Sequence, residues 1–181
     1  NIIAPDHGII WRKNPEKVMS MYMDMASGKA ECGVLIVYDT MWHSTERMVF
    51  PIMRGIEDEG VNSRVIKLRA SPLSDAIKEF WKLRGMLVGT PTINNSMFPS
   101  VAQFLYHLTG LRPKQRIAGA FGSYGWSGGG VKQAYEYLKR MDLQIVEPGI
   151  EINYGLSLED EKKCYEFGKS FAKKVKEFGA S

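Results

Sequence analysis

The feature that most constrains this chain is an uninterrupted apolar run, Val34 to Tyr38, that leads directly into a segment rich in hydroxyl groups. A strand that is apolar at every position is typical of a sheet covered on both faces, so we expect a central strand of a parallel sheet. After Asp39 the chain turns, and from Ser44 onward apolar residues recur with helical spacing. The run therefore predicts a strand, a short turn and a helix, in that order.

The turn between this strand and this helix has the features of a phosphate site. Backbone N-H groups at the start of a helix are unpaired, and the helix dipole favours negative charge there. Thr40, Ser44 and Thr45 add three hydroxyls, and the segment has neither the GxxxxGK[ST] nor the GxGxxG motif of nucleotide-binding loops. Hydroxyls and amides without a cation suit a single terminal phosphate. The alternative is that Ser44 only caps the helix, with Arg47 where a capping box has Glu or Gln.

Strands and helices alternate from Gly33 onward, which predicts an α/β fold: a three-layer sandwich around a five-stranded parallel sheet of order 2-1-3-4-5. Sheets of this order bind ligands beside strands 1 and 3, where the order reverses. The expected strands are residues 34–38, 63–68, 85–89, 116–121 and 143–152, and Pro148 and Gly149 interrupt the last of them. The expected helices are residues 44–59, 73–83 and 158–178, with two more around residues 101–108 and 134–138.

The loops after strands 1, 3 and 4 should meet at the carboxyl edge of this sheet. We expect the second loop, Thr90 to Pro99, to be irregular because it is rich in Pro and Asn, and its amides could read the polar edge of a flat heterocycle. Glycines in the third loop, Gly122 to Gly130, allow close approach to a ring. The aromatic residues Trp42, Tyr124 and Trp126 either cover that ring or are ordinary surface residues.

Composition excludes several other classes of protein. The 181 residues are 44% hydrophobic, and the net charge of +4 comes from scattered Lys and Arg, which favours solvated faces over a nucleic-acid track but could steer an acidic partner. Cys32 and Cys164 are far apart and lack neighbouring histidines, so neither a disulfide framework nor a zinc site is expected. We expect a cytoplasmic protein, because the sequence contains no membrane span and no signal peptide.

Residues 1–32 differ from the rest of the chain. The start lacks Met and does not look like the natural beginning of a protein, and His7 lies in a Pro-Asp-His-Gly turn without a second cluster of metal ligands. Asn14 is expected to cap a helix that begins at Pro15 and ends at Ser27 and Gly28. A linker from Ser27 to Cys32 then predicts a domain boundary.

Three motifs in order, YDTMWHST, GTPTINNSMFPS and FGSYGWSGGG, resemble the three flavin-binding loops of the flavodoxin-like domain of flavodiiron proteins. The ordinary flavodoxin loop is [TS]x[TS]GxT, whereas this chain has Trp42 in place of the second hydroxyl and His43 in place of the glycine. Flavodiiron proteins commonly share this departure. The resemblance implies a flavodoxin-like sandwich, FMN as the cofactor and electron transfer as the role, with the redox chemistry belonging to the flavin.

The resemblance also covers the start of the chain. Flavodiiron proteins have a metallo-beta-lactamase-like domain before the flavodoxin domain, and it ends in a Pro-x-His-Gly-x-x-Trp-Arg segment whose histidine binds the diiron centre. Pro5, His7, Gly8, Trp11 and Arg12 match this segment. His7 therefore resembles the last iron ligand, residues 1–32 resemble the tail of the diiron domain plus a linker helix, and residues 33–181 resemble the FMN domain.

The resemblance implies one set of FMN-binding residues in each loop and no catalytic acid or base. The phosphate would contact Thr40, Met41, Trp42, His43, Ser44 and Thr45. The isoalloxazine ring would lie between Pro91, Thr92, Ile93, Asn94 and Asn95 on one side and Ser123, Tyr124, Gly125, Trp126, Ser127 and Gly128 on the other.

The resemblance further implies an oxidoreductase that reduces oxygen or nitric oxide as a full-length protein, with this chain as its electron carrier. Electrons would come from rubredoxin, a reductase or reduced coenzyme F420, and two subunits would pair head to tail as a homodimer. Two other classes remain as alternatives: a free-standing FMN-dependent quinone reductase, and a receiver-type signalling module. The receiver needs an aspartate where this chain has Thr90.

Overall fold

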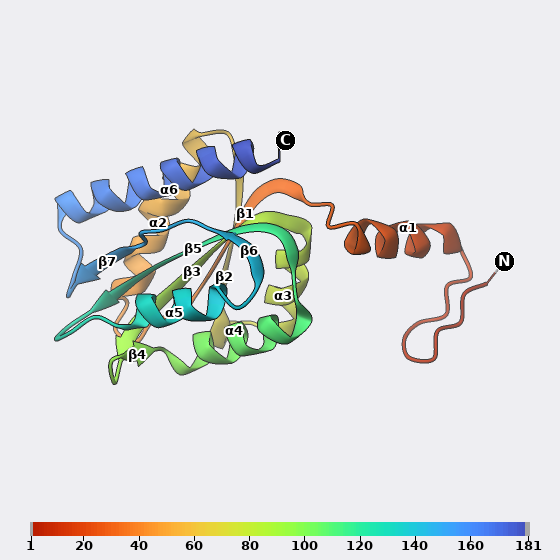
Figure 1. Cartoon of the computed structure of the whole chain (residues 1–181), viewed down its shortest axis with the longest axis horizontal. Coiled ribbons are helices and arrows are strands. Elements are labelled where there is room, and N and C mark those ends of the chain that lie inside the picture. The colour runs from red at the N-terminus through yellow and green to blue at the C-terminus, as the bar shows by residue number, and fades with distance from the viewer. Residues whose placement is uncertain (1, 180–181) are drawn as a thin grey trace.

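One sheet organises the computed structural model, which describes residues 2–179 (Figure 1). Its main path runs β2-β1-β3-β5-β6, with β4 beside β3 and β7 beside β5. All pairs are parallel except β3 with β4. The strands are β1 (Glu31–Tyr38), β2 (Asn62–Lys67), β3 (Leu83–Ile93), β4 (Ser96–Met97), β5 (Lys114–Tyr124), β6 (Asp142–Ile145) and β7 (Ile150–Asn153). The predicted parallel order is confirmed, and the two additional strands are short.

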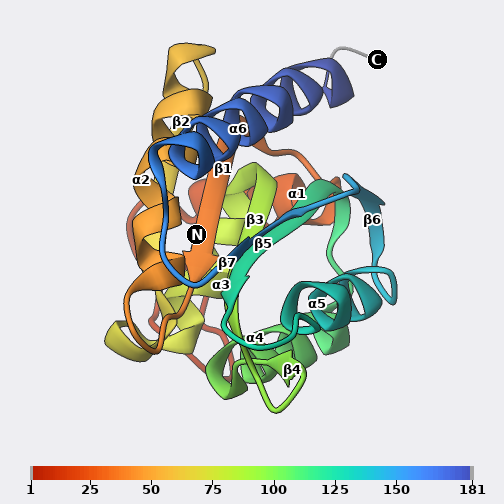
Figure 2. The ribbon, with the colours of Figure 1, turned by 90° about the vertical axis from the view of Figure 1, so that its left-hand side faces the viewer.

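Helices cover both faces of the sheet, giving the expected three layers (Figure 2). On one face lie α2 (Ser44–Asp58) and α6 (Leu158–Phe178), and on the other lie α3 (Leu73–Lys82), α4 (Pro99–Leu111) and α5 (Gly130–Leu138). A short 3-10 turn, η1 (Leu68–Ala70), follows β2. Side chains of β1 alternate between the two cores, with Val34 and Ile36 facing α2 and α6 and with Leu35 and Val37 facing the other helices. This two-sided burial explains why β1 is apolar at every position.

Helices α2 and α6 pack at backbone contact. A Cβ atom on Gly55 would lie 2.1 Å from the Tyr165 carbonyl oxygen, and one on Gly168 would lie 2.1 Å from that of Ile52. Such an approach is possible only without side chains at the crossing point. Helix α2 is therefore held firmly against α6, which fixes the position of its first turn at the carboxyl edge of the sheet.

Three expected boundaries were wrong, and all three corrections extend regular structure. Strand β1 begins at Glu31, so the expected linker from Ser27 to Cys32 ends at Ala30. The segment Thr90 to Pro99 is not irregular, because β3 continues to Ile93 and turns back into β4 through Asn94 and Asn95. These two residues have φ of 50° and 57°, the left-handed values that a two-residue hairpin turn requires and that Asn tolerates. Strand β5 likewise extends beyond Phe121 to Tyr124.

The expected fifth strand is two short strands. β6 ends at Ile145 and β7 begins at Ile150, and both pair with β5. Pro148 lies between them and has no N-H to donate to a ladder, which accounts for the break.

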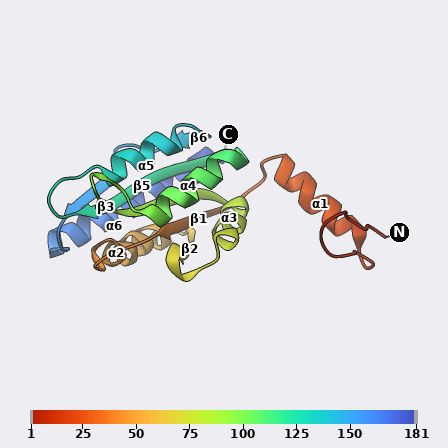
Figure 3. The same ribbon diagram turned by 90° about the horizontal axis from the view of Figure 1, so that it is seen from below.

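The helix that precedes the sheet, α1 (Pro15–Ala26), projects away from it (Figures 1 and 3). Val18 is the one buried residue of this helix. The prediction that Asn14 caps the helix was wrong, because Asn14 has a left-handed φ of 51° and its side chain forms no capping bond. An N-cap needs an extended backbone to aim its oxygen at the first free amides. Before the helix, Ile3 and Trp11 form an antiparallel bridge.

Candidate functional site

The three predicted loops meet at one edge of the sheet, the left end in Figure 1, because β1, β3 and β5 are neighbours and end there. Pairing between β3 and β5 continues to Thr90 with Gly122 and Pro91 with Ser123. The extended strands thus carry the second and third loops side by side beyond the end of β1.

Asp39 organises the first loop, and the sequence analysis did not assign it a role there. Its side chain is fully buried and accepts hydrogen bonds from the Thr40 amide (2.8 Å), from Arg69 Nε (2.9 Å) and from the Ser100 hydroxyl. Arg69 also donates to the Thr40 carbonyl oxygen and stacks 4.9 Å from the centre of the Phe98 ring. Asp39 therefore fixes the turn backbone to both η1 and α4.

The hydroxyl of Thr40 has no hydrogen-bond partner among the described residues. Thr40 is 2% exposed, and its Oγ1 is the one buried side-chain oxygen or nitrogen in residues 2–179 without a hydrogen bond. An unsatisfied buried polar atom costs about 1–3 kcal/mol, so native proteins rarely keep one without a reason. The atom lies between the end of β1 and the first turn of α2, where free N-H groups attract an anion.

The other residues of the first loop divide into exposed and buried positions. Met41, Trp42 and His43 are exposed, and His43 takes a left-handed φ of 65° at the N-cap position of α2. Ser44 is the first helical residue and forms no capping bond, so the alternative that Ser44 caps this helix was wrong. Thr45 is fully buried, and its hydroxyl lies 2.8 Å from the Ser123 hydroxyl, which joins the first loop to the third.

A charged cluster centred on Glu46 flanks the same turn, and the sequence analysis missed it. Glu46 accepts hydrogen bonds from the Tyr38 hydroxyl (2.8 Å) and from Lys67 (3.0 Å), and its other oxygen lies 2.5 Å from His43 Nδ1. The bonds to His43, Lys67 and Tyr38 lower the pKa of Glu46 to about 2. Burial, followed by the bond to Glu46, raises the pKa of Tyr38. Two cations near the turn are thus paired with carboxylates, Arg69 with Asp39 and Lys67 with Glu46.

The second loop is a stiff hairpin. The Thr90 hydroxyl accepts a hydrogen bond from the Phe98 amide (2.8 Å) and donates to the Pro91 carbonyl (2.9 Å). The Met97 amide donates to Gln133 Oε1 of α5 (2.9 Å). At the tip Asn94 and Asn95 are exposed, while Thr92 and Ile93 are partly buried.

The third loop is tied to the second. The Ser127 hydroxyl donates to Asn95 Oδ1 (2.6 Å), and the Gly130 amide donates to the Thr92 hydroxyl (3.0 Å). Gly129 has a φ of 140°, and a Cβ there would lie 2.4 Å from the Asn95 carbonyl oxygen. Glycine is required at this position, because the backbones of the two loops touch.

Several large aromatic side chains around these loops are exposed to solvent. Trp42 is 80% exposed and Trp126 is 97% exposed, while Tyr124 is partly buried. Tyr154, which the sequence analysis missed, is 66% exposed, and its amide donates to the Tyr124 carbonyl (2.7 Å). Exposed aromatic side chains at a loop cluster indicate a binding surface for a flat apolar group.

The arrangement can hold an anion and an adjacent ring, but the described residues include no complete metal site. His7 is exposed, and its Nε2 lies 3.9 Å from Asp6. Within residues 2–179, no group of three His, Cys, Asp or Glu side chains could hold a metal ion. In the same part of the chain, no helix has both the length and the apolar character needed to cross a bilayer.

Comparison with known proteins shows what this geometry resembles. The flavodoxin family model matches residues 36–168. Nitric oxide reductase of Moorella thermoacetica is 42% identical over 174 residues, which is 96% of this chain and 44% of that protein. Rubredoxin oxygen:oxidoreductase from Desulfovibrio gigas superposes with a TM-score of 0.92 and 32% identity, covering 99% of this chain and 45% of that one. The flavodiiron protein from Giardia intestinalis gives 0.88 and 25%, over 98% and 44%. The chain thus spans less than half the length of these relatives.

Proposed function

This chain belongs to the flavodoxin family, whose cofactor is FMN, and from that premise we propose that the three loops bind FMN and that the chain carries electrons as the flavin domain of a flavodiiron oxygen or nitric oxide reductase. The unpartnered hydroxyl of Thr40 is the observation that carries the proposal. A phosphate oxygen at the start of α2 would accept a hydrogen bond from it and remove the cost of its burial.

In this proposal the first loop holds the phosphate. Thr40 and Ser44 would donate their hydroxyls, and the amides of Met41, Trp42 and His43, which lie in the loop that leads into α2, would donate to the same anion. Thr45 supports the site through its bond to Ser123. Arg69 and Lys67 lie nearby, but their pairing with Asp39 and Glu46 leaves hydroxyls and amides as the phosphate donors.

The second and third loops hold the isoalloxazine ring. Residues 91–95 and 123–128 form two walls that are joined by the Ser127 to Asn95 bond. Backbone amides of these two walls would suit the polar edge of the ring, and Tyr124 or Trp126 would suit its face. FMN supplies transfer of one or two electrons when bound, and these residues orient it without moving a proton themselves.

We further propose that residues 1–32 are the tail of a metallo-beta-lactamase-like diiron domain plus a linker helix, and that residues 33–181 are the FMN domain, with His7 as one iron ligand. The chain length relative to its relatives supports this division. The position of α1 also supports it, because this helix projects from the sheet (Figure 1) and exposes large apolar side chains to solvent. These are Met19, Met21, Tyr22, Met23 and Met25, which are 42–70% exposed.

The same relatives also support a proposal for the activity of the longer protein. We propose reduction of oxygen or nitric oxide at the diiron site, with electrons from rubredoxin, a reductase or reduced coenzyme F420. The names of the relatives from Moorella and Desulfovibrio support these substrates and rubredoxin as a donor. Head-to-tail homodimers would bring the FMN of one subunit to the iron of the other.

FMN titration tests the proposal. We expect the purified chain to bind FMN at micromolar concentrations or below, and riboflavin, which lacks the phosphate, much more weakly. A colourless protein that refuses added FMN contradicts the proposal. Equal affinity for FMN and riboflavin contradicts the phosphate site alone. Iron in the longer protein, with oxygen or nitric oxide consumption, distinguishes a flavodiiron protein from a free-standing quinone reductase.

A further inference from the structure

Arg116, far from the FMN loops, carries a buried charge. It lies near the start of β5, is 3% exposed and forms no ion pair with an acid in residues 2–179. Burial, together with the nearby charge of Arg84, lowers its pKa. A guanidinium in this situation must satisfy its N-H groups with neutral acceptors.

Those acceptors come from three separate parts of the chain. Arg116 Nη1 donates to the carbonyl oxygens of Gly28 (2.7 Å), Lys114 (3.0 Å) and Gln115 (3.1 Å), and Nη2 donates to those of Trp81 (2.7 Å) and Lys29 (3.5 Å). Gly28 and Lys29 form the linker between α1 and β1, and Trp81 lies in the last turn of α3. One side chain therefore joins the linker to the sheet and to a helix end whose carbonyls would otherwise be free.

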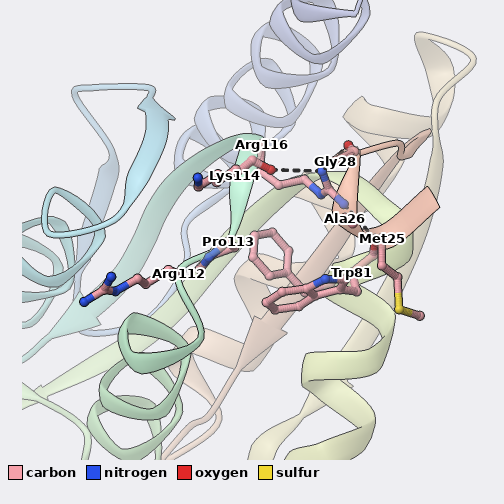
Figure 4. A pocket seen from close by; sticks show the side chains of 9 residues that line it. Met25, Ala26, Gly28, Trp81, Arg112, Pro113, Lys114 and Arg116 are labelled. Carbon is pink, nitrogen blue, oxygen red and sulfur yellow. Dashed lines mark hydrogen bonds between the residues drawn. The ribbon is translucent and has the colours of Figure 1, made fainter. Parts of the chain in front are cut away.

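The local backbone is shaped for this contact. Gly28 has a φ of 76°, and a Cβ there would lie 2.3 Å from Gln115 Oε1. Gln115 itself has a φ of 53°, and the pairing of β5 with β6 shifts register between Lys114 and Ile117. The linker thus lies directly on an irregular start of β5. Figure 4 shows Arg116 reaching Gly28 beside a cavity of about 230 Å³.

We propose that Arg116 is a positioning residue, a clamp that fixes the direction of α1 relative to the FMN domain and so controls the passage of electrons between this domain and the segment that α1 carries. Since α1 buries one residue and projects away from the sheet, its direction depends on how the linker is held. The effect on electron passage rests on the proposed function, whereas the clamp itself does not.

The first test measures the linker. We expect Arg116→Met to speed cleavage after Lys29 by endoproteinase Lys-C about tenfold or more, with faster hydrogen exchange at the Gly28 and Lys29 amides. Arg116→Lys, which keeps the charge but not the fork, should give a smaller increase. Arg112→Met is the matched control, because Arg112 lines the same cavity but points away from the linker (Figure 4). Wild-type rates in both Arg116 variants would overturn the clamp.

The second test uses the longer protein with its diiron domain. We expect Arg116→Lys to slow reoxidation of the flavin by oxygen or nitric oxide several-fold, while FMN affinity, iron content and the rate of flavin reduction by the donor stay at wild-type values. If the linker of Arg116→Lys is looser but its flavin is reoxidised at the wild-type rate, the proposal that Arg116 controls the passage of electrons is overturned. Failure of the wild-type chain to bind FMN would overturn the proposed function and leave the first test decisive for the clamp.

Discussion

The hydroxyls of Thr45 and Ser123 lie 2.8 Å apart in the interior of the molecule, 78 positions apart in the sequence. Both residues are almost fully buried, and this one bond joins the start of α2 to the end of β5. Two of the three loops are therefore held in register by a pair of neutral hydroxyls rather than by an ion pair.

Replacing Thr45 with Val should destabilise the apo protein by about 1–2 kcal/mol, because it leaves the Ser123 hydroxyl buried without a partner. Urea denaturation of the apo protein measures this. Ser44→Ala is the control, since Ser44 makes no capping bond in the described structure, and it should weaken FMN binding with a smaller loss of stability. Equal stability losses in the two variants would contradict the assignment of Thr45 as the supporting residue.

Replacing Thr40 with Val should move stability and affinity in opposite directions. The hydroxyl has no partner in the described structure, so its removal should leave the apo protein as stable as wild type or slightly more stable. FMN affinity should fall by about 1.5–3 kcal/mol, the value of a hydrogen bond to a charged group.

Riboflavin provides the control for this variant. The preference for FMN over riboflavin should shrink in Thr40→Val and persist in Thr40→Ser, which keeps the hydroxyl. If Thr40→Val loses stability and keeps its preference for FMN over riboflavin, then Thr40 stabilises the fold and does not bind the phosphate.

The Glu46 cluster predicts an acid-dependent loss of stability. The folded-state pKa of Glu46, about 2, lies below the ordinary glutamate value of 4.5, so its contribution to stability is fully present above pH 4.5 and disappears as the pH falls toward 2. Because the carboxylate is partly exposed, we expect a contribution of about 1–2 kcal/mol.

Glu46→Gln should accordingly lower the free energy of unfolding at pH 6 and narrow its difference from wild type at pH 3. Urea titrations of the apo protein at the two pH values measure this. Glu166→Gln on α6 is the control, because the exposed Glu166 side chain forms no hydrogen bond within residues 2–179. A constant difference between Glu46→Gln and wild type across this range would mean that the cluster contributes no proton-linked stability.

Gly129→Ala should destabilise the protein by about 1–3 kcal/mol, because its φ of 140° excludes a side chain and the new Cβ would meet the Asn95 carbonyl. FMN affinity should fall as well, since the second and third loops would separate. Gly155→Ala is the control, because a Cβ there has no atom within 4 Å. Thermal unfolding and FMN titration of both variants distinguish loop contact from a general effect of losing glycine.

Much of the fold could be predicted because the information is local. The apolar run of β1 and the helical spacing of α2 and α6 are set by which faces must be buried. The expected bounds of α6 were confirmed at both ends, and at its start Ser157 and Asp160 form a capping box. The second loop was predicted wrongly because Pro and Asn normally break regular structure, whereas here two Asn residues with left-handed φ form a hairpin turn.

The sequence by itself determined the order of strands and helices, and with it the meeting of three unusual loops at one sheet edge. Periodicity, turn chemistry and motifs lie within a few residues of one another, so they can be read along the chain. The tertiary structure alone decided which hydroxyl is free. Thr45 is paired with a residue 78 positions away, Asp39 gathers partners 30 and 61 positions away, and Thr40 is left without any among the described residues. Hydrogen bonds between distant segments depend on packing, and packing cannot be read from neighbours in the sequence.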